Sequence, residues 1–175
     1  MNEFLWRMVA RVATHPRVFG WLVRRASANP YSPIMSKDGA DLYMWRGWIF
    51  NPYGKDARGE ITAPRWQWLP SIRVHRIMRP DRDRHLHDHP WNARTIVLHN
   101  WYEEERPGDN TIATREVFMR RAGYTGRLMF GQYHRISAVP EDGVWTLFFT
   151  WRKRGTWGFD VDGHKVPWRE YLGVE

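Results

Sequence analysis

From residue 30 onward the chain is divided into short strand-like runs separated by turns. No helical pattern longer than a turn or two follows, and turn-rich stretches such as "NPYSP" and "KDGAD" precede the first run. Regularly spaced short strands are typical of antiparallel sandwiches and barrels. The sequence therefore predicts a mainly β fold. The runs are "LYMWRGWIF", "SIRVHRIM", "RTIVLHNWY", "REVFMRR", "RLMFG", "HRISAV" and "VWTLFFTW".

Residues 1–30 follow a different pattern and predict an N-terminal helical extension to a domain that spans residues 31–175. Pro16 separates two short amphipathic helices, and we expect their apolar faces to pack on the main domain. Because Arg7 and Arg11 lie opposite, a hairpin that binds a membrane surface or a partner is the alternative. The apolar faces are Phe4, Leu5, Met8, Val9 and Val12 in the first helix and Val18, Phe19, Leu22 and Val23 in the second.

The stretch "RHLHDHPW" (84–91) places His85, His87 and His89 at alternate positions. The chain has no cysteine, so a disulfide framework and a cysteine-ligated zinc site are excluded, and any metal must be held by His, Asp or Glu. Alternate residues of a strand share a face, and neutral imidazoles buried there need a partner such as a divalent metal. The alternative is an exposed basic strand edge that ends at Pro90.

The histidines lie within a wider pattern of fixed intervals. Asp81, His87, His89, Ala93 and Asn100 stand where the first conserved motif of the cupin superfamily has Gly, His-x-His, Glu and Gly. Asp and Asn are the residues that best replace glycine in a left-handed turn. The chain thus resembles the cupin motif in spacing, but it lacks the glutamate that is usually a metal ligand.

A second stretch resembles the second cupin motif, which runs Gly, Pro-x-Gly, His and Asn. Gly123, Gly131 and His134 match at the correct intervals, whereas Met129 and Ala138 replace the proline and the asparagine. Together the two motifs cover about a third of the chain. The resemblance implies a single antiparallel cupin-like β-barrel, also described as a double-stranded β-helix or jelly roll, with a short helical segment at its N-terminus.

The resemblance implies that His87, His89 and His134 converge inside the barrel as metal ligands. Three imidazoles with open coordination positions suit Fe(II), Zn, Mn, Ni or Cu. This set is most similar to the three-histidine iron dioxygenases of the superfamily, which favours Fe(II) and a non-haem oxygenase that acts on a small anionic substrate. His85 is interpreted as a solvated residue at the mouth, with ligation as the alternative.

Other polar residues are candidates for the walls of the site. Arg94, beside the position of the missing glutamate, and Tyr102 are the candidate substrate-binding residues, although strand alternation also allows Arg94 to face outward. A run of three glutamates, Glu103, Glu104 and Glu105, is interpreted as a solvated face, with a fourth metal ligand as the alternative.

The run "SIRVHRIM" (71–78) has a polar face and an apolar face. Arg73, His75 and Arg79 share the polar face, which we interpret as exposed. The alternative is that this face lines the barrel. It would then form a wall that receives an anion.

The formal net charge of +8 favours anionic partners but does not choose among them. The missing glutamate, at Ala93, favours a non-catalytic binding or sensory module as an alternative to an oxygenase. A cupin-type isomerase or epimerase with a His–Tyr acid–base pair, and a basic barrel that binds nucleic acid, are further alternatives. No stretch has the length and apolarity of a transmembrane segment, so we expect a cytoplasmic protein, and a homodimer is compatible with the sequence.

Overall fold

The computed structural model describes residues 2–36, 39–57, 61–108 and 114–173, and it confirms the predicted mainly β fold with a short N-terminal helical segment. Helices α1 (Glu3–Ala13) and α2 (Pro16–Ser27) come before the strands, and α3 (Trp168–Leu172) follows them. The strands are β1 (Pro30–Met35), β2 (Leu42–Phe50), β3 (Gly54–Lys55), β4 (Ile61–Thr62), β5 (Ser71–Ile77), β6 (Trp91–His99), β7 (Trp101–Pro107), β8 (Arg115–Arg121), β9 (Thr125–Leu128), β10 (Arg135–Ala138), β11 (Val144–Lys153), β12 (Gly158–Val161) and β13 (His164–Pro167).

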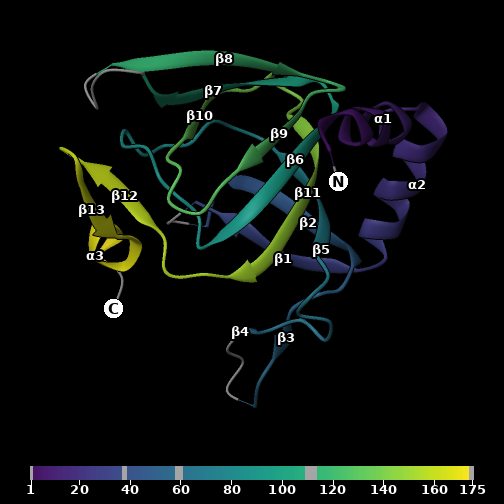
Figure 1. Cartoon of the computed structure of the whole chain (residues 1–175), viewed down its shortest axis with the longest axis horizontal. Coiled ribbons are helices and arrows are strands. Elements are labelled where there is room, and N and C mark those ends of the chain that lie inside the picture. Colours follow the sequence, from purple (N-terminus) through teal and green to yellow (C-terminus); the bar gives the residue numbers. More distant parts are fainter. Residues whose placement is uncertain (1, 37–38, 58–60, 109–113, 174–175) are drawn as a thin grey trace.

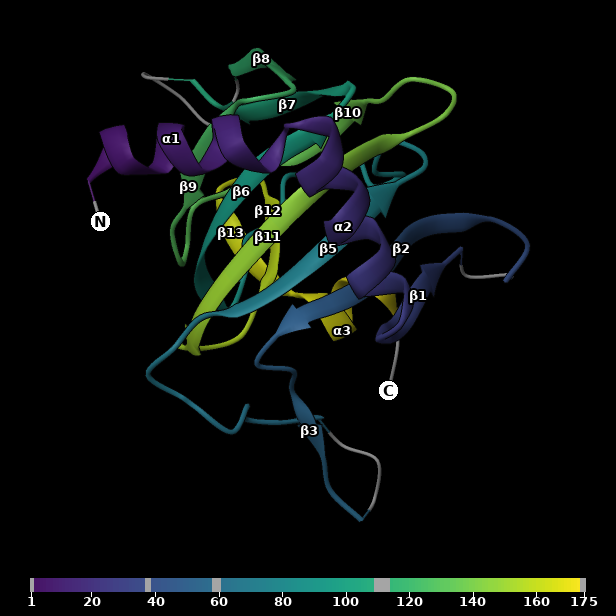
Figure 2. The same cartoon turned by 90° about the vertical axis from the view of Figure 1, so that its right-hand side faces the viewer.

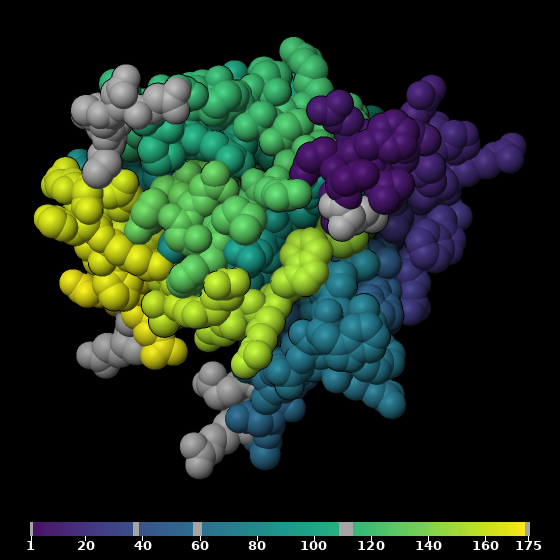
Figure 3. Space-filling model, viewed as in Figure 1, coloured from purple at the N-terminus to yellow at the C-terminus, as the bar shows by residue number. Residues whose placement is uncertain are grey.

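The strands pair antiparallel throughout the described ranges. A six-stranded sheet has the order β1-β2-β5-β11-β6-β9, and a three-stranded sheet has the order β10-β7-β8. The ribbons β12-β13 and β3-β4 complete the fold, with β3-β4 projecting from the end of the larger sheet (Figure 1). The N-terminal helices and the C-terminal ribbon lie on opposite sides of the molecule (Figure 3).

Left-handed residues divide the strands where the sequence predicts turns. Gly123 and Gly131 have φ of 88° and 78°, and Asn100 has φ of 64°. The sequence predicts one strand over "RTIVLHNWY", but the structure has two, because Asn100 turns the chain between β6 and β7. Asp162 and Gly163 also have positive φ and form the tight Asp-Gly turn of the hairpin between β12 and β13.

Helices α1 and α2 cover the outer face of the six-stranded sheet (Figure 2). The Asn2 side chain caps α1 by accepting a hydrogen bond from the Leu5 amide (2.9 Å), and Pro16 begins α2 at a position that needs no amide donor. None of the described helices has the length and apolarity needed to cross a membrane. Helices and sheet share one core, formed by Trp6, Ala10, Ala13, Leu22, Ala26, Val74, Ile96, Leu98, Leu147 and Phe149.

The predicted packing face of α1 is wrong. Of the predicted residues Val9 packs against the core, but the others, Phe4, Leu5, Met8 and Val12, are exposed, with 67% of Phe4 accessible. The buried face is instead Trp6, Ala10 and Ala13. The small alanines let the helix approach the sheet closely, and the Trp6 ring packs edge-on against Phe149 at 5.0 Å. Because Glu3 also pairs with the buried Arg94, with oxygen and nitrogen 2.6 Å apart, specific contacts fix the rotation of the helix, and its more apolar face stays outside.

Gly47 lets α2 lie directly on β2. A Cβ atom at Gly47 would lie 2.3 Å from the Ala26 carbonyl oxygen, so Gly47→Ala must push the helix away from the sheet. We expect the free energy of unfolding to fall by about 1–3 kcal/mol in chemical denaturation. The control is Gly20→Ala in α2, whose Cβ would meet only the flexible end of Arg24 at 3.4 Å. Equal effects of the two substitutions would contradict this account.

Candidate metal centre

A cavity of about 930 Å³ lies between the two sheets. Strands β2, β5, β6 and β11 contribute side chains on one side, and β7 and β10 contribute Tyr102, Glu104, Arg106 and Ile136 on another. The C-terminal ribbon and α3 add aromatic side chains at the edge. The volume and the mostly apolar, aromatic lining are typical of a small-molecule site. The C-terminal aromatic residues are Trp157, Phe159, Trp168 and Tyr171.

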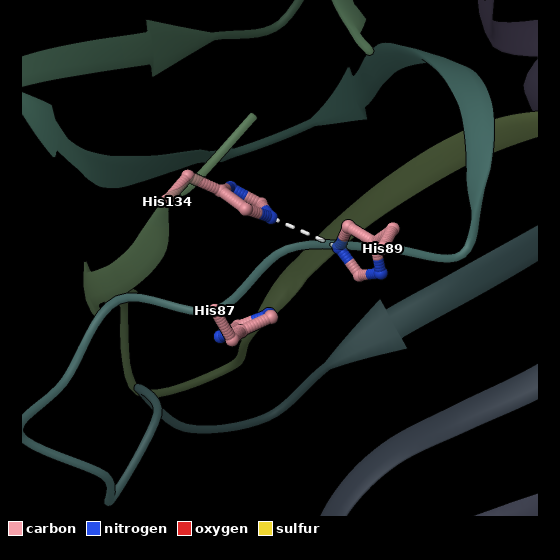
Figure 4. A group of neighbouring side chains, drawn as sticks. All are labelled: His87, His89 and His134. Atoms are coloured by element: carbon pink, nitrogen blue, oxygen red, sulfur yellow. Dashed lines mark hydrogen bonds between the residues drawn. The ribbon is translucent and has the colours of Figure 1, made fainter. Parts of the chain in front are cut away.

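Three histidines converge in this cavity (Figure 4). His87 and His89 lie on the segment between β5 and β6, and His134 directly precedes β10. One ligand nitrogen from each ring lies within 4.8 Å of the other two, and the Nε2 atoms of His89 and His134 are 3.0 Å apart. Two nitrogens that bind one metal at right angles, each at about 2.1 Å, would be about 3 Å apart. The donor set therefore fits a divalent transition metal.

The first histidine segment is extended but is not the regular strand that the sequence predicts. Isolated bridges join His87 to Phe159 and to His134, the latter with amide–carbonyl distances of 2.9 Å in both directions. Alternation nevertheless holds, since Leu86 and Asp88 are buried on the other side, where Asp88 accepts hydrogen bonds from the Gly158 amide (2.8 Å) and the Lys165 ammonium (2.5 Å). The Asp88 contacts anchor the segment so that the imidazoles face the cavity.

Burial keeps His87 and His89 uncharged. Burial lowers the pKa of His87 to about 4, although Asp81 acts in the opposite direction. Burial lowers the pKa of His89 well below its ordinary value, and electrostatic repulsion from His134 and His87 acts in the same direction. A neutral imidazole offers the nitrogen lone pair that a metal ligand needs. Near neutral pH both rings are thus ready to bind a cation without first losing a proton.

Glu104 orients His134. Its Oε1 atom lies 3.0 Å from His134 Nδ1, and because a carboxylate only accepts, Nδ1 carries the proton and Nε2 faces the cavity with a lone pair. Arg106 and Arg120 also donate to Glu104, at 3.0 and 2.9 Å. Burial alone would raise the pKa of Glu104, but the hydrogen bond from His134 and the charge of Arg106 outweigh it and lower the pKa to about 2.

The glutamate run is not a solvated face. Glu104 is only 3% exposed, and Glu105 pairs with Arg115 and Arg135. Among the described residues the cluster that can hold a metal contains the three histidines and no carboxylate, so Glu104 contacts a member of the cluster and does not belong to it. Sequence reasoning missed this role. Strand alternation could have singled out Glu104, since Tyr102 and Glu104 share the buried face of β7.

Asp81 does not adopt the left-handed turn expected at the motif's first glycine position. Positive φ among the described non-glycine residues occurs at Asn51, Asn100 and Asp162. The Asp81 carboxylate instead accepts hydrogen bonds from the Tyr43 hydroxyl and from the Ile136 amide (2.7 Å). Its Oδ2 atom lies 4.0 Å from His87 Nδ1, so Asp81 ties the first histidine segment to β10 and β2.

The two candidate substrate residues lie in different places. Tyr102 is buried and lines the cavity, and burial, followed by the charge of Glu104, raises the pKa of its phenol well above the usual value. Arg94 is absent from the described lining: its guanidinium pairs with Glu3 and lies over the Trp6 ring at 4.7 Å, on the helix side of the sheet. Strand alternation turns the Arg94 side chain toward the helices and away from the cavity, so it does not contribute to the cavity wall as expected of a substrate contact.

His85 stays outside the cluster. Its Nδ1 atom lies 2.9 Å from the hydroxyl of Tyr171 in α3, and the two rings are nearly perpendicular with centroids 5.5 Å apart. His85 is half-buried, not fully solvated. It joins the histidine segment to the C-terminal helix at the rim of the cavity.

The polar face of β5 lines the cavity, which corrects the expectation that it is exposed. Arg73 and His75 are buried, with 4% and 7% of their surfaces accessible, and Ile77 lies on the same face. The opposite face carries Val74, which packs under the helices. Strand β5 is therefore covered on both sides. Its Arg73 and His75 side chains line the same cavity as the three histidines.

No protein-family model and no curated protein sequence matches the chain. A variant of oxalate decarboxylase from Bacillus subtilis superposes with a TM-score of 0.51 at 10% identity, over 86% of this chain and 33% of that one. The Fe(II) form of HppE has a TM-score of 0.46 at 11% identity, over 69% and 56%. A mannose-6-phosphate isomerase-like protein from Ralstonia eutropha has a TM-score of 0.41 at 12% identity, over 61% and 84%.

These structural neighbours are cupin-type proteins, and the oxalate decarboxylase, of which this chain spans about a third, carries the argument for the fold. The predicted resemblance to the cupin superfamily is confirmed at the level of the fold. At 10% identity the likeness extends no further. The molecule is a cupin-like β protein whose cavity holds a three-histidine cluster.

Proposed function

We propose that this protein is a metal-dependent oxygenase of cupin-like fold, with His87, His89 and His134 as the ligands of Fe(II) and a small anion as the substrate. The observation that supports it is the convergence of three half-buried imidazoles, with two Nε2 atoms 3.0 Å apart, on a cavity large enough for a substrate. When bound, Fe(II) supplies a redox centre and a template at which substrate and dioxygen meet. Zn, Mn, Ni and Cu are compatible with the same ligands.

The protein's own groups prepare this centre in three ways. Glu104 holds the tautomer of His134, and burial keeps His87 and His89 neutral. The three histidines line the cavity, so a small molecule that binds there can reach the centre. The aromatic rings of Trp157 and Phe159 lie beside His87, at 6.1 and 6.0 Å between centroids. They give the centre an apolar surrounding, in which electrostatic interactions with an anion are stronger than in water.

Anaerobic loading with Fe(II) followed by nitric oxide tests this proposal. Nitric oxide binds high-spin Fe(II) only where a coordination position is open, and the product has a characteristic EPR signal. We expect about one iron per chain and a nitrosyl signal. Protein that binds no iron after anaerobic loading, or iron that does not react with nitric oxide, would contradict the proposal.

A non-catalytic metal-binding module is the second candidate function. Ala93 stands where the cupin motif has its glutamate, and no carboxylate joins the described histidine cluster. Metal retained at one per chain with no reaction toward nitric oxide would favour this role over the oxygenase.

A further inference from the structure

Arg73 is a buried cation with no buried anion beside it. Only 4% of its surface is accessible, and within the described residues no carboxylate forms an ion pair with it. Burial lowers the pKa of its guanidinium, and the groups that act in the other direction are the hydroxyls of Tyr53 and Tyr31, which are neutral at ordinary pH. A buried charge without a counterion is costly, so proteins keep one mainly where a ligand completes it.

Aromatic rings surround the Arg73 guanidinium. Its Cζ atom lies 5.2 Å from the Trp48 ring centroid, 5.3 Å from Tyr53, 5.6 Å from Phe148 and 5.9 Å from Trp91. These rings stabilise the cation through their faces and hold it in place, but they accept few hydrogen bonds. The guanidinium is thus positioned, with a hydrogen bond to Tyr53, while its Nε atom has no hydrogen-bond partner.

Three buried nitrogens in this part of the cavity have no hydrogen-bond partner. They are Arg73 Nε, His75 Nε2 and Trp91 Nε1, and all three residues line the cavity. Arginine and tryptophan nitrogens can only donate, and an imidazole nitrogen can donate in one tautomer. Buried donors are normally satisfied, so unpaired donors together with an unpaired cation indicate the place of an anionic acceptor.

This cationic region adjoins the histidine cluster. The Phe148 ring lies 5.0 Å from His75 and 6.3 Å from His89, measured between centroids. Trp91 contacts His89 at 5.0 Å and also flanks Arg73. One aromatic ring therefore separates Arg73 from a candidate metal ligand, a span that a small molecule can bridge.

We propose that Arg73, with His75 and Trp91, binds the carboxylate of a small monocarboxylic acid whose other end reaches the His87–His89–His134 centre. The orientation toward the metal rests on the proposed function, whereas the carboxylate site itself does not. One guanidinium balances one negative charge, and its planar donors match the two oxygens of a carboxylate. A phosphate dianion would bring a second negative charge, and among the arginines that line the described cavity Arg73 alone is buried.

The neighbouring arginines already have partners. Arg46 donates to the Ser32 carbonyl through two nitrogens and lies over the Tyr31 ring at 4.3 Å. Arg79 lies over the Tyr43 ring at 4.9 Å and donates to the Pro80 carbonyl (3.1 Å). The positive charge of Arg79 also acts to lower the pKa of Asp83 and so favours its carboxylate form. Arg79 Nε also lacks a hydrogen-bond partner, but Arg46 and Arg79 are only half-buried, whereas Arg73 is buried. Burial therefore singles out Arg73, and Arg79 is a control within the same cavity.

The test uses benzoate, benzamide and phenyl phosphate as probes of the full chain after treatment with a chelator. Calorimetry or ligand-observed NMR should show that wild-type protein binds benzoate and discriminates against the uncharged amide and the dianion. Arg73→Met, which keeps the bulk of the side chain, should weaken benzoate binding by about tenfold to 100-fold. Arg79→Met should bind as wild type does. The NMR signal of Arg73 Nε–H should shift on addition of benzoate, which tests the site without any substitution.

Benzoate that binds no better than benzamide to wild-type protein would overturn the proposal, as would Arg73→Met with wild-type affinity. If Arg73→Met does not fold, the Nε–H shift and the comparison of probes in wild-type protein decide. Preference for phenyl phosphate would overturn the carboxylate in favour of a phosphate ester. Because no metal is present, benzoate binding can succeed where iron loading fails, and the reverse, so failures of the two proposals are distinguishable.

Discussion

Replacing any one of His87, His89 and His134 with alanine is expected to abolish stoichiometric metal binding. Each substitution removes one of the three nitrogens that lie within 4.8 Å of one another, and two imidazoles remain. The loss of affinity should exceed the roughly 10- to 100-fold that follows when a residue behind a ligand is changed. Metal content by plasma mass spectrometry, after anaerobic reconstitution of untagged protein, measures it directly.

His85→Ala is the matched control for these variants. His85 belongs to the same segment and has the same spacing, but its ring contacts Tyr171 instead of the cluster, so we expect this variant to keep a full complement of metal. Circular dichroism should show folded protein in every case, because the core beneath the helices contains none of these histidines. Equal metal loss in His85→Ala, or metal retained in His134→Ala, would refute the assignment of ligands.

The convergence of the histidines could be predicted from the sequence because a resemblance to known motifs carries long-range information. His134 is 45 residues from His89, and no local pattern joins them. The interval from Gly123 through Gly131 to His134 provides the missing information, because it matches the second cupin motif. Both glycines take left-handed conformations, which set the turns before that histidine. Alternation around His87 and His89 then places both rings on one side even though the segment is not a regular strand.

The walls of the cavity could not be predicted in the same way. A strand with Arg73 and His75 on one face has the pattern of a half-exposed strand, and only the tertiary arrangement shows that helices cover one side and a cavity the other. Similarly, the exposed face of α1 is more apolar in sequence than the face that packs. Ala10 and Ala13 bury well because they are small, which a pattern of apolar residues does not record.

Three consecutive glutamates are equivalent by composition, and the pairing of β7 decides between them. In the three-stranded sheet Glu104 is opposite Ile136 on β10 and Phe118 on β8. That register turns Glu104 inward to His134, whereas Glu103 forms no ion pair with any residue that the structure describes. A one-residue shift would have exchanged their roles.

Glu104→Ala is expected to lower both stability and metal affinity. The substitution removes the acceptor shared by His134, Arg106 and Arg120, and it leaves two largely buried guanidinium groups without that partner. Breaking such a buried network typically lowers the free energy of unfolding by about 3–5 kcal/mol. Because His134 also loses the group that holds its tautomer, metal affinity should fall by about 10- to 100-fold. Urea denaturation of metal-free protein and metal titration measure the two effects separately.

Glu103→Ala, one residue away on the same strand, is the control and should change neither the free energy of unfolding nor the metal affinity.

The pH dependence provides a second test in metal-free protein. The folded-state pKa of Glu104 is about 2 against an ordinary value of 4.5, so its stabilising contribution is complete above pH 4.5 and is lost as the pH falls toward 2. The stability difference between wild type and Glu104→Ala should therefore be largest near neutral pH and narrow in acid. A difference that stays constant over that range would show that Glu104 acts through packing and not through its charge.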